Sequence, residues 1–148
     1  MMKQLLYVTS ISLLLSCNAG RQSQKQSSDT LNQVDSLLKQ KQFFAARDLF
    51  SSAFHSFSRV YQLKIGAELD NVFNRLQESN TKIDTLLADF SGELSVADKY
   101  HLYRLKQMNH SKLFEYAAAD RAVLELLSTY SNLMTPEEIK DFQNTRKI

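Results

Sequence analysis

The residues most often used for nucleophilic or metal chemistry are few in this 148-residue sequence: Cys17, His55, His101 and His110. A metal site on one helix needs ligands three or four residues apart, whereas His101 and His110 are nine residues apart. The sequence contains neither an HExxH zinc motif nor a glycine-rich phosphate loop. We therefore expect His55 to be a partly buried packing residue, and we expect no catalytic residue, no metal and no cofactor.

Residues 1–16 have the features of a secretory signal. A positive charge at Lys3 precedes a mostly apolar run from Leu5 to Leu15. About 20 apolar residues are needed to span a bilayer, so this shorter run predicts a signal peptide and not a transmembrane helix.

The end of this signal, Leu14-Leu15-Ser16-Cys17, resembles the lipobox of bacterial lipoproteins. The resemblance implies cleavage before Cys17, acylation of its thiol and stable anchoring in a membrane. Because Asn18 and not an aspartate follows, it also implies the outer membrane, with the periplasmic or cell-surface side left open. The alternative is an ordinary signal peptide with an incidental cysteine.

The residues after Cys17 are polar and rich in glutamine and serine, so we expect a flexible tether over 17–29. The remaining residues, 30–148, suit one compact domain. The formal net charge is +2 and no basic stripe is present, which argues against a nucleic-acid partner. With Cys17 acylated, no cysteine would remain for a disulfide.

The fold class is expected to be all-α. The sequence has one proline and only Gly66 and Gly92 beyond the tether, too few turn residues for a strand-rich domain. Apolar residues recur at helical spacing in about six to seven segments. These segments are 31–38, 43–57, 60–73, 80–90, 96–111, 115–130 and a last helix for which Thr135, Pro136 and Glu138 predict a capping box. Glu78, Asp84 and Asp89 alternate with Lys82, as on a solvated helix face.

One of these segments carries a repeat motif. Phe43, Ala46, Phe50 and Ala53 resemble the aromatic and small positions in the second helix of a tetratricopeptide (TPR) repeat. Weaker copies follow, namely Leu76, Ser79, Ile83 and Leu86, and then Tyr116, Ala119, Val123 and Leu126. The copies start at 43, 76 and 116, so the steps are 33 and 40 against the 34 of that family. The alternative is an ordinary helical bundle whose aromatic stripe is core.

TPR-like stacks bind protein segments on the face formed by the first helix of each pair. The resemblance therefore implies a partner-binding surface on two helices. Its residues would be Lys64, Glu68, Asn71, His101, Arg104 and Met108.

A second resemblance concerns the segments ELDNVFNRLQESNTKIDTLL, KLFEYAAADRAVLELL and PEEIKDFQNTRKI. They look like the N-terminal helical region of bacterial lipoproteins in which a retropepsin-like aspartyl protease domain follows. That catalytic domain needs Asp-Thr-Gly or Asp-Ser-Gly, and this sequence contains neither.

The sequence thus predicts a non-enzymatic, lipid-anchored helical repeat module that binds a protein or peptide partner in the bacterial envelope. Two alternatives remain open. One is the helical part of a truncated or split aspartyl protease lipoprotein, and the other is a purely structural envelope lipoprotein.

Overall fold

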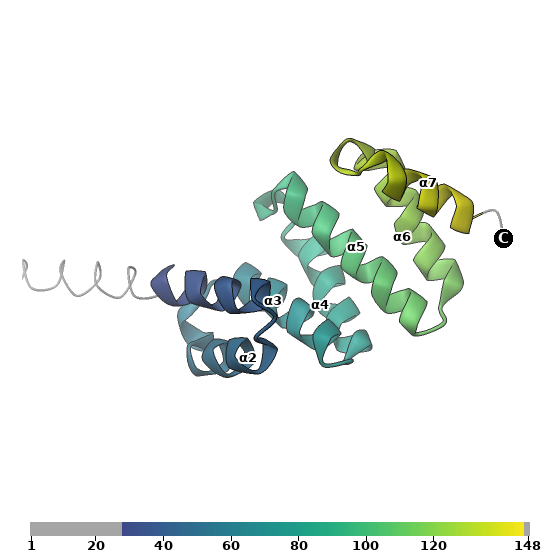
Figure 1. The fold of residues 1–148 in the computed structure, drawn as a ribbon. Coiled ribbons are helices and arrows are strands. Elements are labelled where there is room, and N and C mark those ends of the chain that lie inside the picture. Colours follow the sequence, from purple (N-terminus) through teal and green to yellow (C-terminus); the bar gives the residue numbers. More distant parts are fainter. Residues whose placement is uncertain (1–27, 147–148) are drawn as a thin grey trace, which may run out of the picture. The chain divides into compact units, whose positions relative to one another are not determined.

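The structure, a computed structural model, describes residues 28–146 and contains only helices and their connections over that range (Figure 1). Over residues 28–146, seven helices pack as adjacent antiparallel pairs, which confirms the expected all-α class. The first helix covers 28–39, so residues 28 and 29, assigned above to the tether, are helical. The others are α2 (Phe43–Ser52), α3 (Arg59–Val72), α4 (Leu76–Asp89), α5 (Val96–Lys112), α6 (Tyr116–Thr129) and α7 (Pro136–Thr145).

The chain forms two compact units that divide after Phe57. In the first unit Val34, Ala46 and Phe50 are buried. The ring of Phe50 stacks on that of Phe57, with ring centroids 5.8 Å apart. Helix α2 ends five residues before the expected boundary, because a 3-10 turn follows it at Phe54–Ser56.

This early end changes the environment of His55. The hydroxyl of Ser56 donates to the carbonyl of Ala53, which favours a tight turn over a continued helix. His55 lies in that turn, is exposed and meets the edge of the Phe54 ring. The expectation of a partly buried His55 is therefore wrong.

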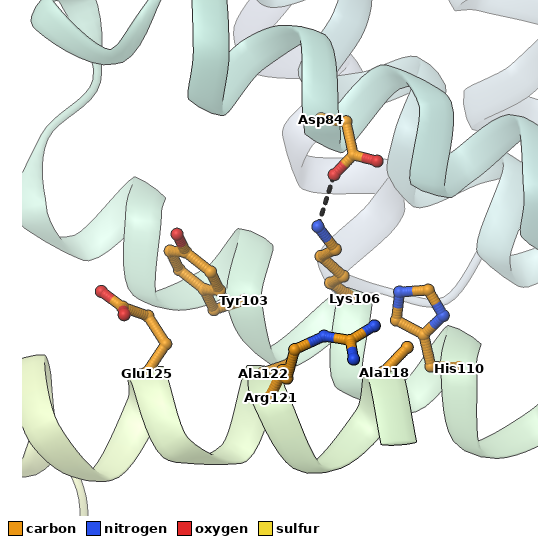
Figure 2. A pocket seen from close by; sticks show the side chains of 8 residues that line it. All are labelled: Asp84, Tyr103, Lys106, His110, Ala118, Arg121, Ala122 and Glu125. Atoms are coloured by element: carbon orange, nitrogen blue, oxygen red, sulfur yellow. Dashed lines mark hydrogen bonds and ion pairs between the residues drawn. The ribbon is translucent and has the colours of Figure 1, made fainter. Parts of the chain in front are cut away.

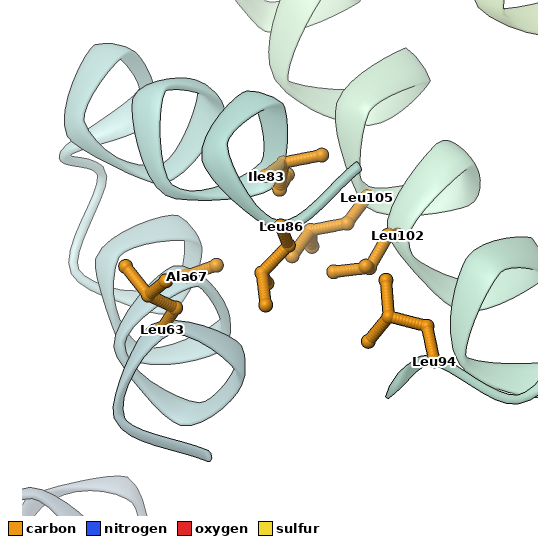
Figure 3. Close-up of a cluster of buried hydrophobic side chains, with 7 residues drawn as sticks. All are labelled: Leu63, Ala67, Ile83, Leu86, Leu94, Leu102 and Leu105. Carbon is orange, nitrogen blue, oxygen red and sulfur yellow. The ribbon is translucent and has the colours of Figure 1, made fainter. Parts of the chain in front are cut away.

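In the second unit a leucine-rich core joins α3, α4 and α5 (Figure 3). Its buried members are Leu63, Ala67, Ile83, Leu86, Leu94, Leu102 and Leu105. A second cluster joins α5, α6 and α7 around buried Leu126, Tyr130 and Met134. Helix α5 contributes to both clusters, with Leu102 and Leu105 in the first and Tyr100 and Tyr103 in the second.

The same tight turn connects the two helices of every pair. Its central residue, Lys41, Asn74 or Phe114, has a φ of 59°, 59° and 61°, respectively. The amide of the next residue donates to the carbonyl five residues back, at 2.9, 2.7 and 2.9 Å. This pairing is the Schellman motif, which usually places glycine at the positive-φ position. The turn explains why α4 begins at Leu76 and not at the expected Asn80, since the helix starts directly after it.

A second recurrent connection joins successive pairs. A 3-10 turn is followed by a buried apolar residue and then by a Ser or Thr whose hydroxyl caps the next helix. The apolar residue and the cap are Phe57 and Ser58, then Leu94 and Ser95, then Met134 and Thr135. The capping box predicted at Thr135 and Glu138 is confirmed, with Pro136 at the first helical position.

Candidate functional site

A pocket of about 420 Å³ lies in the second unit, where α4, α5 and α6 contribute side chains (Figure 2). The lining residues are Asp84, Tyr103, Lys106, His110, Ala118, Arg121, Ala122 and Glu125. Six of these eight side chains are polar or charged, so the pocket is suited to a polar ligand.

Helix α6 supplies half of the lining from one face. Ala118, Arg121, Ala122 and Glu125 stand at i, i+3, i+4 and i+7, which places them in one row along the helix. Because two of the four are alanines, their short side chains leave room between the helices. The exposed Arg121 and the partly buried Glu125 line this space with their longer side chains.

Helix α5 supplies Tyr103, Lys106 and His110, again at helical spacing. The ammonium group of Lys106 forms an ion pair with the carboxylate of Asp84 on α4, at 2.5 Å. Side-chain exposure is 25% for Lys106 and 58% for Asp84. Asp84, expected on a solvated face, is therefore part of the pocket wall.

The His110 imidazole lies largely buried at the end of α5. Its Nδ1 is 2.6 Å from a carboxylate oxygen of Glu115 and 3.4 Å from the amide nitrogen of Asn80. The hydrogen bond with His110, helped by Gln77, lowers the pKa of the Glu115 carboxyl. Both contacts are made at Nδ1, so this edge of the His110 ring faces Glu115 and Asn80.

Two charged residues of the pocket are not engaged in this way. Over residues 28–146, neither the Arg121 guanidinium nor the Glu125 carboxylate has a hydrogen bond or an ion pair within the chain. Figure 2 shows Arg121 near Lys106 and His110, and Glu125 beside Tyr103. Burial, followed by the charge of Glu125, raises the pKa of the Tyr103 hydroxyl, which is therefore a protonated donor at neutral pH. The pocket therefore holds Arg121 near the Lys106–Asp84 ion pair, and Glu125 beside Tyr103.

The partner-binding residues predicted from the sequence lie instead on α3 and α5, where most of them link neighbouring helices. Lys64 pairs with Asp98, and Glu68 pairs with His101 at 3.0 Å. Arg104 pairs with Glu138 of α7 at 3.2 Å. The structure therefore brings these charges together as connections between successive pairs.

The remaining two predicted residues differ sharply in exposure. Asn71 is buried, and its amide donates to the side-chain oxygen of Asn109 at 2.5 Å. Met108 is 42% exposed. Asn71 therefore contributes to the interior, whereas Met108 is accessible to a ligand.

The pocket residues of α6 lie next to its core residues in the sequence pattern. The buried residues of α6 are Ala119, Ala122, Val123 and Leu126. The pattern Ala-x-x-Arg-Ala-x-x-Glu from 118 to 125 overlaps this buried stripe at Ala122 and places Ala118, Arg121 and Glu125 along its edge.

Cys17 and the proposed lipobox lie outside the described residues. Within 28–146, no helix is both long enough and apolar enough to cross a bilayer. In the same range, no three or more His, Cys, Asp or Glu side chains come together as a metal site would require.

Comparisons with known proteins identify no family: no family model, curated protein or solved structure matches this chain.

Proposed function

We propose that this chain is a non-enzymatic, TPR-like helical repeat module that binds a segment of another protein. The support from the fold is its recurrence. The Schellman turns at Lys41, Asn74 and Phe114 recur at steps of 33 and 40 residues. The capping residues Ser58, Ser95 and Thr135 recur at steps of 37 and 40. Stacked helix pairs of this kind commonly form extended binding surfaces.

The observation that carries the proposal is the pocket between α4, α5 and α6, with Arg121 and Glu125 unpaired within it. Binding sites are typically concave and carry a few convergent polar groups. A guanidinium in such a concavity has five donors that a partner's carboxylate or carbonyl groups can satisfy. A protein segment supplies such groups from both its backbone and its side chains.

The α3–α5 face predicted from the sequence is a competing surface for the same function. Its charges Lys64, His101 and Arg104 already have partners within the chain. A ligand on that face would have to replace or share these ion pairs, which reduces the net gain from binding. The pocket requires no such exchange at Arg121, so we favour it.

The lipobox-like sequence around Cys17 would put this module on a membrane of the bacterial envelope. In that position the module would hold its partner close to the membrane surface.

Selection from a random peptide library displayed on phage, with the purified full chain as bait, tests the proposal. We expect enriched peptides whose binding is abolished by Ala118→Glu, because the new side chain fills the pocket. Ala117→Glu is the matched control, since Ala117 neighbours it on the same helix, is exposed and does not line the pocket. Thermal unfolding must show that both variants fold equally well.

A third variant distinguishes binding in the pocket from binding on the α3–α5 face. Charge reversal at both Lys64 and Arg104 should leave the selected peptides bound. If that reversal abolishes binding while Ala118→Glu does not, the module binds through α3 and α5. If no peptide is enriched above background, the peptide-binding function is refuted.

A further inference from the structure

The turn between α5 and α6 exposes two aromatic side chains that touch each other. Phe114 is 74% exposed and Tyr116 is 67% exposed, and their rings meet edge to face with centroids 6.3 Å apart. Leu76, which begins α4 as Tyr116 begins α6, is instead buried. Because water solvates aromatic rings poorly, two adjacent exposed rings on one turn indicate a surface that meets another apolar medium.

Phe114 also has a backbone conformation that is unfavourable for its side chain. Its φ of 61° lies in the left-handed region, which bulky residues rarely adopt, whereas the equivalent turn between α3 and α4 has Asn74 there. The exposed ring recovers little of this cost through contacts within the protein. Strain that folding does not require is commonly found at functional segments, so the position of Phe114 supports a role outside the fold.

The charged groups of the turn are Lys112 and Glu115. Lys112 is exposed, and over residues 28–146 its ammonium has no hydrogen bond or ion pair. Glu115 is bonded to His110, at 2.6 Å, and to Gln77, at 3.3 Å. The neighbouring start of α4 carries one arginine and one glutamate and so adds no net charge. The positive group of the turn is therefore available to a partner, whereas the negative group is already engaged.

Aromatic rings beside an unpaired lysine are suited to the interfacial layer of a lipid bilayer. Aromatic side chains are enriched at that depth, and a lysine can lay its stem along apolar groups while its ammonium reaches the lipid phosphates. Side chains that project from a turn can enter lipid directly, whereas a protein partner would have to provide a matching pocket.

The length of chain before the first helix is compatible with such a contact. Cys17, the proposed site of acylation, lies eleven residues before Ser28, at which the first helix begins. Eleven residues span at most about 40 Å even when fully extended. An acylated Cys17 would therefore keep the helical domain close to the bilayer.

We propose that the α5–α6 turn inserts Phe114 and Tyr116 into the interfacial layer of the bilayer, with Lys112 at the lipid phosphates. This inference rests on the proposed anchoring through Cys17 and is independent of peptide binding in the pocket. Contact at this turn would fix which end of α5 and α6 faces the membrane.

Tryptophan fluorescence tests the contact, because the sequence contains no tryptophan. Phe114→Trp places a single reporter in the turn. Val96→Trp is the matched control, since Val96 is also apolar and exposed but lies at the opposite end of α5. The purified full chain is mixed with vesicles of phosphatidylethanolamine and phosphatidylglycerol, with or without bromine on the upper acyl carbons as a quencher. We expect bromine to reduce the emission of Phe114→Trp about twofold or more and to leave that of Val96→Trp nearly unchanged.

Equal quenching of the two reporters, or quenching of neither, would overturn the inference. A blue shift of the Phe114→Trp emission that grows with protein concentration in the absence of vesicles would assign the turn to a second copy and would also overturn it. Thermal unfolding must show that both variants fold as the wild type does. Tyr116→Trp is a second reporter in the same turn and replaces Phe114→Trp if that variant does not fold.

A charge reversal tests the role of the lysine. Lys112→Glu should reduce the quenching of the Phe114→Trp reporter about twofold, because a carboxylate is repelled by the lipid phosphates. Lys140→Glu, at an exposed lysine of α7, should leave this quenching unchanged. Equal effects of the two reversals would show that only the total charge of the protein matters and would remove Lys112 from the contact.

The failure of this inference can be told apart from failure of the proposed function. Peptide binding that Ala118→Glu blocks, without selective quenching at position 114, would refute only the membrane contact. Selective quenching without any Ala118-sensitive peptide would refute only peptide binding. The intact mass of the same preparation reports acylation of Cys17, so a missing anchor is recognised separately from a turn that does not meet lipid.

Discussion

The helix pairs α3–α4 and α5–α6 have the same turns and helix caps. They differ in the side chains that pack against the helix that follows each pair. Both pairs close with a Schellman turn, and both are followed by a 3-10 turn and a hydroxyl-capped helix. The interface between α3–α4 and α5 is partly polar, and we call it the polar seam. The interface between α5–α6 and α7 is aromatic, and we call it the aromatic seam.

The polar seam is centred on Asn109, whose side chain is fully buried. Its amide donates to the hydroxyl of Ser79 and to the side-chain oxygen of Asn80, both at 2.8 Å. It accepts from Asn71, and Ser79 in turn donates to the carbonyl of Ala67. Every buried side-chain nitrogen and oxygen of the described residues is paired, so this network satisfies its members fully.

The aromatic seam works differently. Tyr130 is buried against Tyr100 and Tyr103, with ring centroids 6.4 and 5.8 Å apart. Phe142 of α7 joins this cluster, and the guanidinium of Arg104 lies 5.2 Å from its ring centroid. Ring contacts tolerate small displacements, whereas each hydrogen bond requires one donor opposite one acceptor. The comparison indicates that the first seam fixes the position of α5, and hence of the pocket residues Lys106 and His110.

Asn109→Ala removes the central residue of the polar seam and is expected to have the largest effect. Removal of the amide leaves Asn71, Ser79 and Asn80 without their buried partner, and a buried unsatisfied polar group costs roughly 1–3 kcal/mol. We expect the free energy of unfolding to fall by about 3 kcal/mol in urea titrations followed by circular dichroism.

Asn144→Ala is the matched control for this prediction, because Asn144 is exposed on α7. A surface substitution of this kind should change stability by no more than about 0.5 kcal/mol. If Asn109→Ala had an equally small effect, the polar seam would not be what fixes α5.

The sequence predicted the features of this fold that depend on local chemistry. Thr135, Pro136 and Glu138 form a capping box within four consecutive residues, so the signal was complete in the sequence. The all-α class followed in the same way from the scarcity of glycine and proline.

Features that depend on distant partners could not be predicted in this way. Asn109 looks like a surface residue in α5, because its partners on α3 and α4 are 29 to 38 residues away in sequence. Tyr116 was aligned with the buried Leu76, yet it is 67% exposed. Arg121 and Glu125 line a pocket whose other walls come from α4 and α5, so the sequence of α6 alone does not specify it.

A smaller effect on stability is expected at the Schellman turns of these two pairs. Asn74 and Phe114 occupy equivalent positive-φ positions, which asparagine tolerates better than a bulky aromatic residue. Phe114 is 74% exposed and meets only the edge of the Tyr116 ring among the aromatic contacts of the described residues. We expect Phe114→Gly to raise the free energy of unfolding by about 0.5 kcal/mol, because the relief of backbone strain exceeds the loss of this exposed contact.

Asn74→Gly serves as the comparison, and its gain measured in the same urea titrations should be smaller. A loss of stability in Phe114→Gly would mean that the ring contributes more than the strained backbone costs. The exposed Phe114–Tyr116 pair would then be a structural element of the second pair.

The smallest expected effect concerns the ion pairs that link α5 to α3 and to α7. His101 joins α5 to α3 through Glu68, whereas Arg104 joins α5 to α7 through Glu138. The hydrogen bond that His101 donates to the Glu68 carboxylate raises the pKa of His101 above 6.5, against a smaller opposing effect of burial. Because the folded pKa exceeds the unfolded one, this contribution is complete below pH 6.5 and is lost as pH rises through the folded pKa. The Arg104 link keeps its positive charge throughout this range.

We therefore expect an NMR titration of the His101 ring to give a pKa above 6.5 that falls in Glu68→Gln. Because the His101 side chain is 54% exposed, the associated loss of stability between pH 5.5 and 8 should be small, yet larger in the wild type than in Glu68→Gln. Arg104→Gln should reduce stability equally at both pH values, since its link does not titrate there. An unchanged His101 pKa in Glu68→Gln would show that Lys64 and Asp98, the other charges near this ring, govern it instead. The two links would then differ in geometry but not in their response to pH.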